Sequence, residues 1–296
     1  MKVAEVFGTS VHDHSLDAED LRARRWCRFR NSVCTKVSKI NPIGICALSI
    51  GNDATIVCPA RFYEDSRVFR DAAKIAFGEG AEVVVLPEHK LLSIPAAIED
   101  DKSKKIGKVD FMLGRLENDK IVDFAALEIQ SVYTSGGGVK DAFGHFIATR
   151  EAGKEGDLGV DFRSSAQKRL VPQLRLKVPI FRRWGKKFFV AIDDTFFAAL
   201  PGFGTTTSGN SELTWLAYPL RLQGAQPLIL DDPIVHYTEW SKVEQALEEG
   251  KPPDGPSDVI VELQARISGS RIDKYRIVST SSCQSTPPTS SPRSSR

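Results

Sequence analysis

The stretch VDFMLGRLENDKIVDFAALEIQSVYTSGGG, residues 109–138, decides how this chain folds. Its two apolar runs flank ENDK, residues 117–120, a sequence typical of a tight turn, so the stretch predicts a β-hairpin. Side chains alternate across a strand, which places Glu128 and Gln130 on the same face. Pairing around the turn brings Asp110 to Glu128, so we expect two neighbouring carboxylates at one end of the sheet.

Neighbouring carboxylates are a chemical signal because two of them stay ionised in a desolvated place only when a cation lies between them. A divalent cation at that position would activate water and bind a scissile phosphate. The residues alone leave a structural alternative open, in which strand carboxylates pair with nearby lysines. Asp123, Asp193 and Asp194 are competing acids, and Glu88 is either an additional ligand or a solvated loop residue.

The composition is that of an ordinary folded protein, with 296 residues, 41% hydrophobic and 26% charged residues, and a net charge of +2. The chain is therefore not a polycation, although local clusters of Lys and Arg still permit nucleic-acid binding. No apolar run approaches the length of a membrane span. The first twenty residues turn acidic too early for a signal peptide. We expect a cytoplasmic protein with no membrane partner.

Four of the five cysteines lie close together in the sequence, at Cys27, Cys34, Cys46 and Cys58. Four thiolates form a common structural metal site in small modules that have little core. Such soft ligands favour zinc or iron over magnesium or calcium. The spacing differs from paired CxxC knuckles, so unrelated core thiols remain the alternative.

The remaining patterns predict an α/β core with an N-terminal metal-binding module. We expect helices at 66–78, 164–185 and 243–250, with Pro172 and Pro179 limiting or kinking the second. We expect strands at 187–193 and 211–222, and a buried strand at 81–87 that ends at Pro87. The expected organisation is a four-cysteine module at 1–65, a catalytic domain at 66–278, and a disordered Ser/Thr/Pro-rich tail at 279–296.

Several of these features together resemble a known family. The order D-x17-E-x-Q is similar to the PD-(D/E)xK nuclease motif in the variant of NotI-type restriction endonucleases, where Gln replaces the usual Lys. The four cysteines, with CPARF at the last, resemble the metal module of that family. KRLVPQL, FRRWGKKFFVAID and ELTWLAYPL are also similar, so the resemblance spans roughly residues 25–220.

The resemblance implies a PD-(D/E)xK nuclease core, a mixed sheet flanked by helices, and Mg²⁺-dependent cleavage of both strands of a short DNA palindrome by a homodimer. It assigns Asp110 and Glu128 as metal ligands and Gln130 as the third motif residue. The carbonyl of Ile129 is an additional expected Mg²⁺ ligand. The chain departs from the pattern at Val109, which replaces the motif proline, and it is short for the family.

The same resemblance implies that the four cysteines bind iron and that the DNA site is GC-rich with a GGCC centre. A cognate DNA methyltransferase is then expected in the same genome. Phosphate contacts should supply much of the affinity for DNA. The candidates form the densest basic cluster of the sequence: Lys168, Arg169, Arg182, Arg183, Lys186 and Lys187.

Two other functions fit the same sequence features. One is a non-catalytic four-cysteine DNA-binding protein in which the acidic strands are only structural. The other is a repair or RNA nuclease on the same fold, which would cleave according to structure without a fixed sequence.

Overall fold

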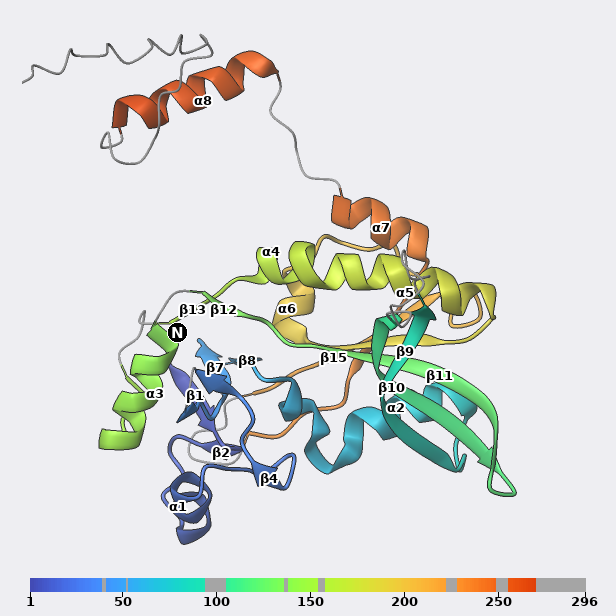
Figure 1. Ribbon diagram of the computed structural model, residues 1–296, viewed down its shortest axis with the longest axis horizontal. Helices are drawn as coiled ribbons and strands as arrows, with labels where there is room; N and C mark the ends of the chain where they lie inside the picture. Colours follow the sequence, from blue (N-terminus) through green and yellow to red (C-terminus); the bar gives the residue numbers. More distant parts are fainter. Residues whose placement is uncertain are drawn as a thin grey trace, which may run out of the picture. The chain divides into compact units, whose positions relative to one another are not determined.

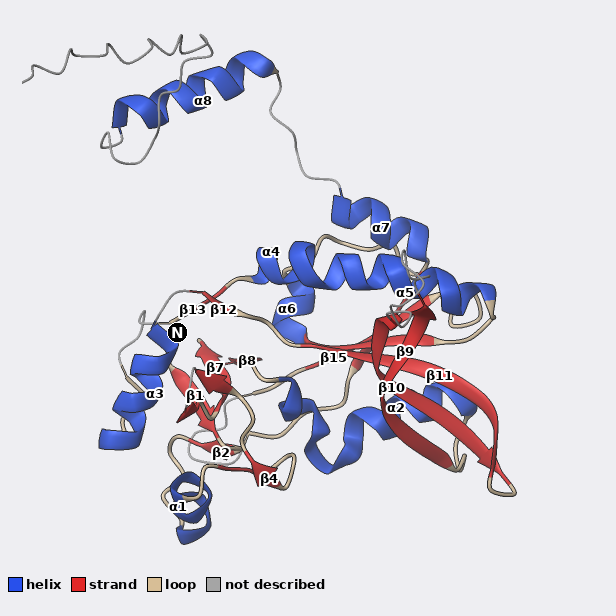
Figure 2. Cartoon of the chain, in the orientation of Figure 1, coloured by secondary structure: helices blue, strands red, loops and turns tan. Residues whose placement is uncertain are grey.

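The predicted hairpin lies in the middle of a six-stranded sheet in the computed structural model (Figures 1 and 2). The strand order is β16-β15-β14-β11-β10-β9. β11, β14 and β15 are parallel, whereas the other neighbouring pairs are antiparallel. The strands are β9 (Val83–Ser93), β10 (Lys105–Glu117), β11 (Lys120–Gln130), β14 (Phe188–Asp193), β15 (Leu213–Tyr218) and β16 (Ile234–Thr238). The mixed α/β fold expected from the sequence is confirmed.

The backbone conformation of residues 117–120 (ENDK) explains why the turn between β10 and β11 forms at this position. Asn118 and Asp119 both have a positive φ, 50° and 61°, as two-residue hairpin turns require and as Asn and Asp tolerate best. From the pair Glu117–Lys120 the ladder runs to the pair Phe111–Leu127. Asp110 and Glu128 follow directly after this last pair.

Helices cover both faces of the sheet (Figure 1). Because side chains alternate along a strand, Ala126 and Val190 join one core together with α5, while Leu127 and Phe189 join a second core together with α2. The helices of this unit are α1 (Leu16–Ala23), α2 (Arg67–Phe77), α3 (Gly138–Thr149), α4 (Phe162–Ser165), α5 (Val171–Arg183), α6 (Asp194–Ala198) and α7 (Trp240–Glu248).

The long helix predicted at 164–185 forms in three segments. α4 is followed by a π-helical turn, Ala166–Leu170, and then by α5. Pro172 lies in the first turn of α5, directly after the π-helical turn, and the helical backbone continues through it. α5 continues past Pro179, so this proline does not end the helix.

The strand predicted at 81–87 is longer and more exposed than the sequence indicated. β9 continues past Pro87 to Ser93, and Val83 and Val85 are only half-buried. The reason is its position, because β9 forms the edge of the sheet. An edge strand tolerates a proline, which cannot donate to a ladder, and an apolar β-branched run does not require burial on both faces.

The N-terminal residues form a separate four-stranded antiparallel sheet with the order β2-β1-β7-β8. Its strands are β1 (Val3–Val6), β2 (Thr9–Ser10), β7 (Ile45–Ile50) and β8 (Asp53–Ile56). Three two-stranded ribbons accompany the sheets: β3 (Trp26–Cys27) with β4 (Ser32–Val33), β5 (Val37–Ser38) with β6 (Asn41–Pro42), and β12 (Thr134–Ser135) with β13 (Gly159–Val160). A 3₁₀ segment, Pro59–Ser66, leads from β8 into α2.

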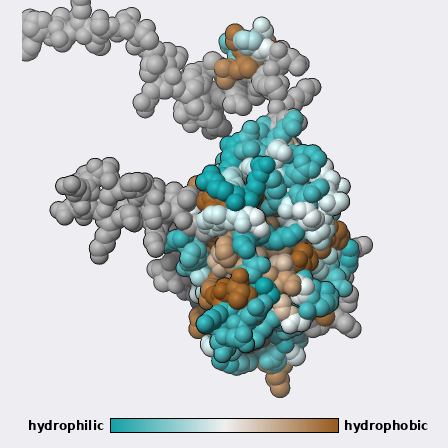
Figure 3. Space-filling model, turned by 90° about the vertical axis from the view of Figure 1, so that its right-hand side faces the viewer, coloured by the Kyte–Doolittle hydropathy of each residue, from teal (hydrophilic) through white to brown (hydrophobic). Residues whose placement is uncertain are grey.

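The structure describes residues 1–38, 41–51, 53–93, 105–135, 138–153, 158–221, 228–248 and 255–269. Residues 1–249 form one compact unit, and residues 250–296 form a second, described only through α8 (Pro256–Gly269). The predicted tail at 279–296 lies outside the described residues. In the part of the chain that is described, no helix has the length and apolar character to cross a membrane. The face shown in Figure 3 is mainly hydrophilic, with separate apolar patches.

Candidate active site

Asp110 and Glu128 are brought together where the β10–β11 ladder ends. The Asp110 carboxylate accepts a hydrogen bond from the Ile129 N–H through Oδ2, at 3.0 Å. In return, the Asp110 N–H donates to Glu128 Oε1 at 3.4 Å. Each carboxylate therefore bonds to the backbone of the opposite strand, and the proximity expected from the sequence is present.

Glu128 is almost fully buried, with 5% of its surface exposed. The pKa of Glu128 is raised to about 7. Burial is the largest cause and the nearby Asp110 carboxylate is the second, whereas Lys177 lowers the pKa. The Lys177 ammonium donates to Glu128 Oε1 at 2.7 Å. The site thus concentrates negative charge in a desolvated place, which is the condition under which a bound cation is stabilising.

Two oxygens remain available for an ion. Within the described part of the chain, no hydrogen bond engages Oδ1 of Asp110 or Oε2 of Glu128. The Ile129 carbonyl adds a third donor, because the N–H and C=O of one strand residue point to the same side and the Ile129 N–H points at Asp110. This all-oxygen donor set suits Mg²⁺.

Gln130 lies on the same face as Glu128 and is 8% exposed. Its amide nitrogen donates to the Ser131 carbonyl at 2.9 Å. The side chain carries no charge, but it keeps a second N–H and an acceptor oxygen.

A pocket of about 430 Å³ opens beside these residues. It contains acidic, basic, amide and aromatic groups from several elements, as expected for a site that binds a polar ligand. The lining residues are Arg30, Pro59, Tyr63, Pro87, Glu88, Asp110, Phe111, Ile129, Gln130, Ser131, Tyr133, Arg169 and Gln173.

Other acidic residues that the sequence offered as candidates for the catalytic site form contacts within the protein. Asp193 is fully buried and caps α6, where its carboxylate accepts from the Phe196 N–H. Asp123 pairs with Lys186 at 2.5 Å. Glu88 lines the pocket, but its side chain pairs with Lys108 at 2.5 Å.

The six predicted DNA-binding residues do not form one patch. Lys168 and Arg169 precede α5, whereas Arg182, Arg183, Lys186 and Lys187 lie at or beyond its other end. At 1.5 Å of rise per residue the two groups are roughly 20 Å apart. Only Arg169 lines the pocket, and its guanidinium lies 3.5 Å from the centre of the Tyr133 ring.

Three of the four basic residues at the C-terminal end of α5 form contacts with other groups of the protein. Arg182 pairs with Glu212 at 2.5 Å, Lys186 pairs with Asp123, and Lys187 donates to the Ser208 carbonyl at 2.8 Å. Pairing with protein groups leaves less of their charge available to DNA.

The four cysteines pack in one cluster with Ala60, Phe29 and Tyr63. All four are free thiols. Burial raises the pKa of Cys27, Cys34 and Cys46, and neighbouring cysteines raise these pKa values further. The donors are of the kind that zinc and iron prefer, yet among the described residues no group of three or more His, Cys, Asp or Glu forms a metal-holding set.

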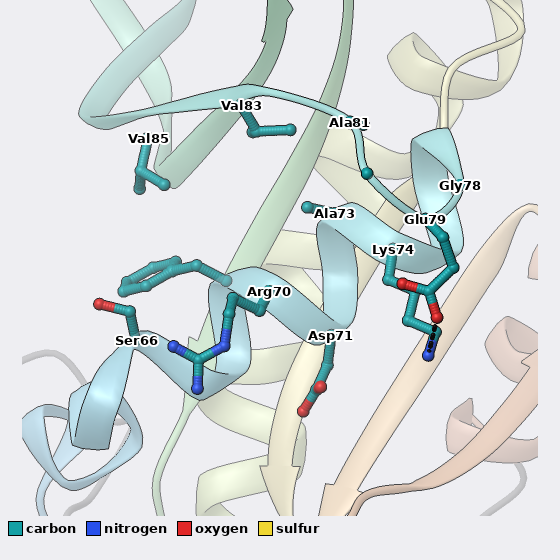
Figure 4. A pocket seen from close by; sticks show the side chains of 12 residues that line it. Ser66, Arg70, Asp71, Ala73, Lys74, Gly78, Glu79, Ala81, Val83 and Val85 are labelled. Atoms are coloured by element: carbon teal, nitrogen blue, oxygen red, sulfur yellow. Dashed lines mark ion pairs between the residues drawn. The ribbon is translucent and has the colours of Figure 1, made fainter.

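A second pocket, of about 520 Å³, lies between α2 and the chain that leads into and begins β9 (Figure 4). It contains Arg70, Asp71 and an ion pair between Lys74 and Glu79. None of the residues predicted for the active site lines it.

Sequence reasoning missed Lys177, Gln173 and Arg30. Arg169, Gln173 and Lys177 follow one another at intervals of four residues, so they share a helix face, and this polar stripe was the available signal. Arg30 stands in the turn between Cys27 and Cys34, and no pattern in the sequence relates this turn to the acidic strands.

Comparison with known protein families gives a match. A family model described as Restriction endonuclease NotI matches residues 6–227, well over half of the chain. No protein of curated function matches the sequence. The matched segment contains the four cysteines, the β10–β11 hairpin and α5.

Proposed function

The chain belongs to the NotI restriction endonuclease family, and from this premise we propose that it is a type II restriction endonuclease that cleaves both strands of double-stranded DNA with Mg²⁺. Family membership implies a site-specific deoxyribonuclease. The observation that carries the proposal is the pairing of Asp110 with a buried Glu128 beside a polar pocket.

We assign the ion-binding role to Asp110, Glu128 and the Ile129 carbonyl. The two carboxylates are already oriented by backbone hydrogen bonds, and among the described residues the second oxygen of each accepts no hydrogen bond. These groups would hold a Mg²⁺ ion, which would neutralise charge on the phosphoryl oxygens and lower the pKa of a water molecule. Burial of Glu128 excludes bulk water from this side of the site and strengthens its attraction for a cation.

Gln130 has a supporting role in this proposal. Its second amide N–H is able to donate to a phosphate oxygen or to align the attacking water, but it supplies neither charge nor a base. Arg30 and Arg169 line the same pocket and are suited to bind phosphates, because a guanidinium presents a planar set of donors.

The four-cysteine cluster is proposed to hold a structural iron or zinc ion. The support is its composition and packing, because four soft donors from separate segments meet in one cluster. A metal there would fix the β3–β4 ribbon, whose turn carries Arg30 into the catalytic pocket. Among the described residues the four sulfurs are not arranged as a ligand set, so metal binding would require the cysteine side chains to rearrange.

The finer assignments follow from the family resemblance. We propose that the enzyme acts as a homodimer, since two-fold symmetry in the protein matches a palindromic DNA site. A GC-rich palindrome and a cognate methyltransferase in the same genome complete the proposal. A cytoplasmic location is consistent with action on DNA.

The test is digestion of a sequenced phage genome by the full-length protein with Mg²⁺, followed by sequencing of the ends. Discrete fragments whose ends share one short palindrome are expected. Binding to DNA with no cleavage would support the non-catalytic DNA-binding alternative. Cleavage at structural features without a common sequence would support the repair nuclease alternative.

A further inference from the structure

Lys177 is a buried lysine that contacts the candidate metal site. It lies on α5 and only 2% of its surface is exposed. Its ammonium donates to Glu128 Oε1 at 2.7 Å and to Gln173 Oε1 at 2.9 Å. Lysine is almost never fully buried unless it is paired, so this pairing is the feature that keeps Lys177 inside the protein.

The contact determines which oxygen of Glu128 is free. Oε1 accepts from both Lys177 and the Asp110 N–H. Oε2 has no hydrogen bond within the described residues. Without Lys177, the longer bond of 3.4 Å from the Asp110 backbone would be the remaining hydrogen bond of the carboxylate, and the charge of Asp110 would repel it.

Lys177 also brings positive charge to a motif that lacks it. Position 130 is a glutamine, and its amide is bonded to the Ser131 carbonyl. Among the ion pairs found in the described residues, the one that reaches Glu128 comes from Lys177, and none reaches Asp110. The positive charge beside Glu128 therefore comes from Lys177 on α5 and not from a residue of β11, the strand that carries the motif.

We propose that Lys177 is a positioning residue of the active site, which holds Glu128 by Oε1 so that Oε2 is presented to the metal ion and which supplies the positive charge that Gln130 lacks. The proposal rests on the function proposed above. It extends that function by adding a residue outside the D-x17-E-x-Q motif.

A buried ion pair with a purely structural role would predict a different outcome. In that case, replacement of Lys177 would lower stability but would not change the preference of the site among metal ions. A displaced Glu128 should instead weaken Mg²⁺ binding more than Ca²⁺ binding, because Mg²⁺ requires near-ideal octahedral geometry and Ca²⁺ is flexible. Both ions carry the same charge, so the loss of the lysine charge largely cancels from the ratio of their affinities.

The experiment compares the full-length protein with Lys177→Met, Gln173→Leu and the matched control Arg175→Met. Arg175 lies on the same helix, but it is exposed and pairs with Glu244 at 3.2 Å. Mg²⁺ and Ca²⁺ affinities are measured by calorimetric titration, and kcat is measured on cleavable DNA after circular dichroism has shown that each variant is folded. Removal of a group that orients a metal ligand lowers metal affinity or activity by roughly 10- to 100-fold.

For Lys177→Met we expect kcat to fall within that range and the Mg²⁺/Ca²⁺ affinity ratio to fall by about tenfold. Gln173→Leu should shift both quantities in the same direction by a smaller factor, and Arg175→Met should leave both unchanged. If Lys177→Met does not fold, Gln173→Leu decides the question, since Gln173 is exposed and its replacement does not empty the core.

An unchanged affinity ratio in the folded variants overturns the role of Lys177, even when wild-type protein cleaves DNA. Absence of Mg²⁺-dependent cleavage by wild-type protein overturns the proposed function instead. The calorimetric comparison tests the role of Lys177 in either case.

Discussion

Replacement of Asp193 by alanine should separate a structural carboxylate from the catalytic pair. Asp193 ends β14, next to β11, and from the sequence it competed with Glu128 for a catalytic role. Its carboxylate accepts from Thr55 Oγ1 at 3.0 Å, from the Ile56 N–H at 3.0 Å and from the Phe196 N–H at 3.1 Å. These hydrogen bonds connect β8 to the six-stranded sheet and cap the N-terminus of α6.

The expected loss of stability follows from these contacts. Loss of a helix N-cap costs about 1 kcal/mol, and each buried donor left without a partner costs about 1–3 kcal/mol. Because the Thr55 hydroxyl and the Ile56 N–H both lose their acceptor, the free energy of unfolding should fall by about 3–7 kcal/mol. At about 2–4 °C per kcal/mol for a unit of this size, Tm should fall by roughly 10–20 °C.

The assay combines urea unfolding with cleavage kinetics at low temperature. Asp193→Ala should lower the urea midpoint, while kcat per folded molecule remains close to that of wild type. The neighbouring Asp194→Ala serves as the control, because Asp194 has none of these side-chain hydrogen bonds among the described residues. Unchanged stability together with lost cleavage in Asp193→Ala would refute the assignment of this residue.

Three further predictions concern charge and metals. Gln130→Lys should retain most of the cleavage activity, whereas Glu128→Ala should not, because the glutamine supplies no essential charge; a greater loss in Gln130→Lys than in Glu128→Ala contradicts this role. In metal-free protein, burial raises the pKa of Glu5 and of Glu128 to about 7, above the ordinary value of 4.5, so the folded state retains protons that the unfolded chain releases. The free energy of unfolding should therefore fall as pH rises from about 4.5 to 7, by at most about 7 kcal/mol for the two groups at about 1.4 kcal/mol per pKa unit. Urea titrations with EDTA measure this change, and a rise in the free energy of unfolding over this range would contradict the prediction. Cys46→Ser should lower bound iron or zinc, measured by elemental analysis of the purified protein, and wild-type protein without either metal would rule out the structural site.

The central hairpin was predictable because its signals are local. The turn residues Asn118 and Asp119 and the alternation along β11 are properties of adjacent residues, and together they place Asp110 near Glu128. The fold class follows from the same kind of pattern, with apolar strands interleaved with helical periodicity.

The rest of the site depends on contacts between distant segments. Lys177 is 49 residues from Glu128 in the sequence, and the packing of α5 against the sheet brings them together. The exposure of β9 could not be predicted for a related reason. The sequence of a strand does not show whether the strand pairs with one neighbouring strand, as β9 does at the edge of the sheet, or with two. Asp193 and Glu128 both end or nearly end apolar strands, and only the donors that surround each carboxylate distinguish their roles.

The most direct test of the account is cleavage of a DNA substrate by wild-type protein and by Glu128→Ala over a range of Mg²⁺ concentrations. Wild-type protein should produce discrete fragments that require Mg²⁺. Glu128→Ala should lose about a thousandfold in rate, since a catalytic metal ion contributes several kcal/mol to transition-state stabilisation. Full activity of Glu128→Ala, or cleavage by wild-type protein without any divalent ion, would contradict the account.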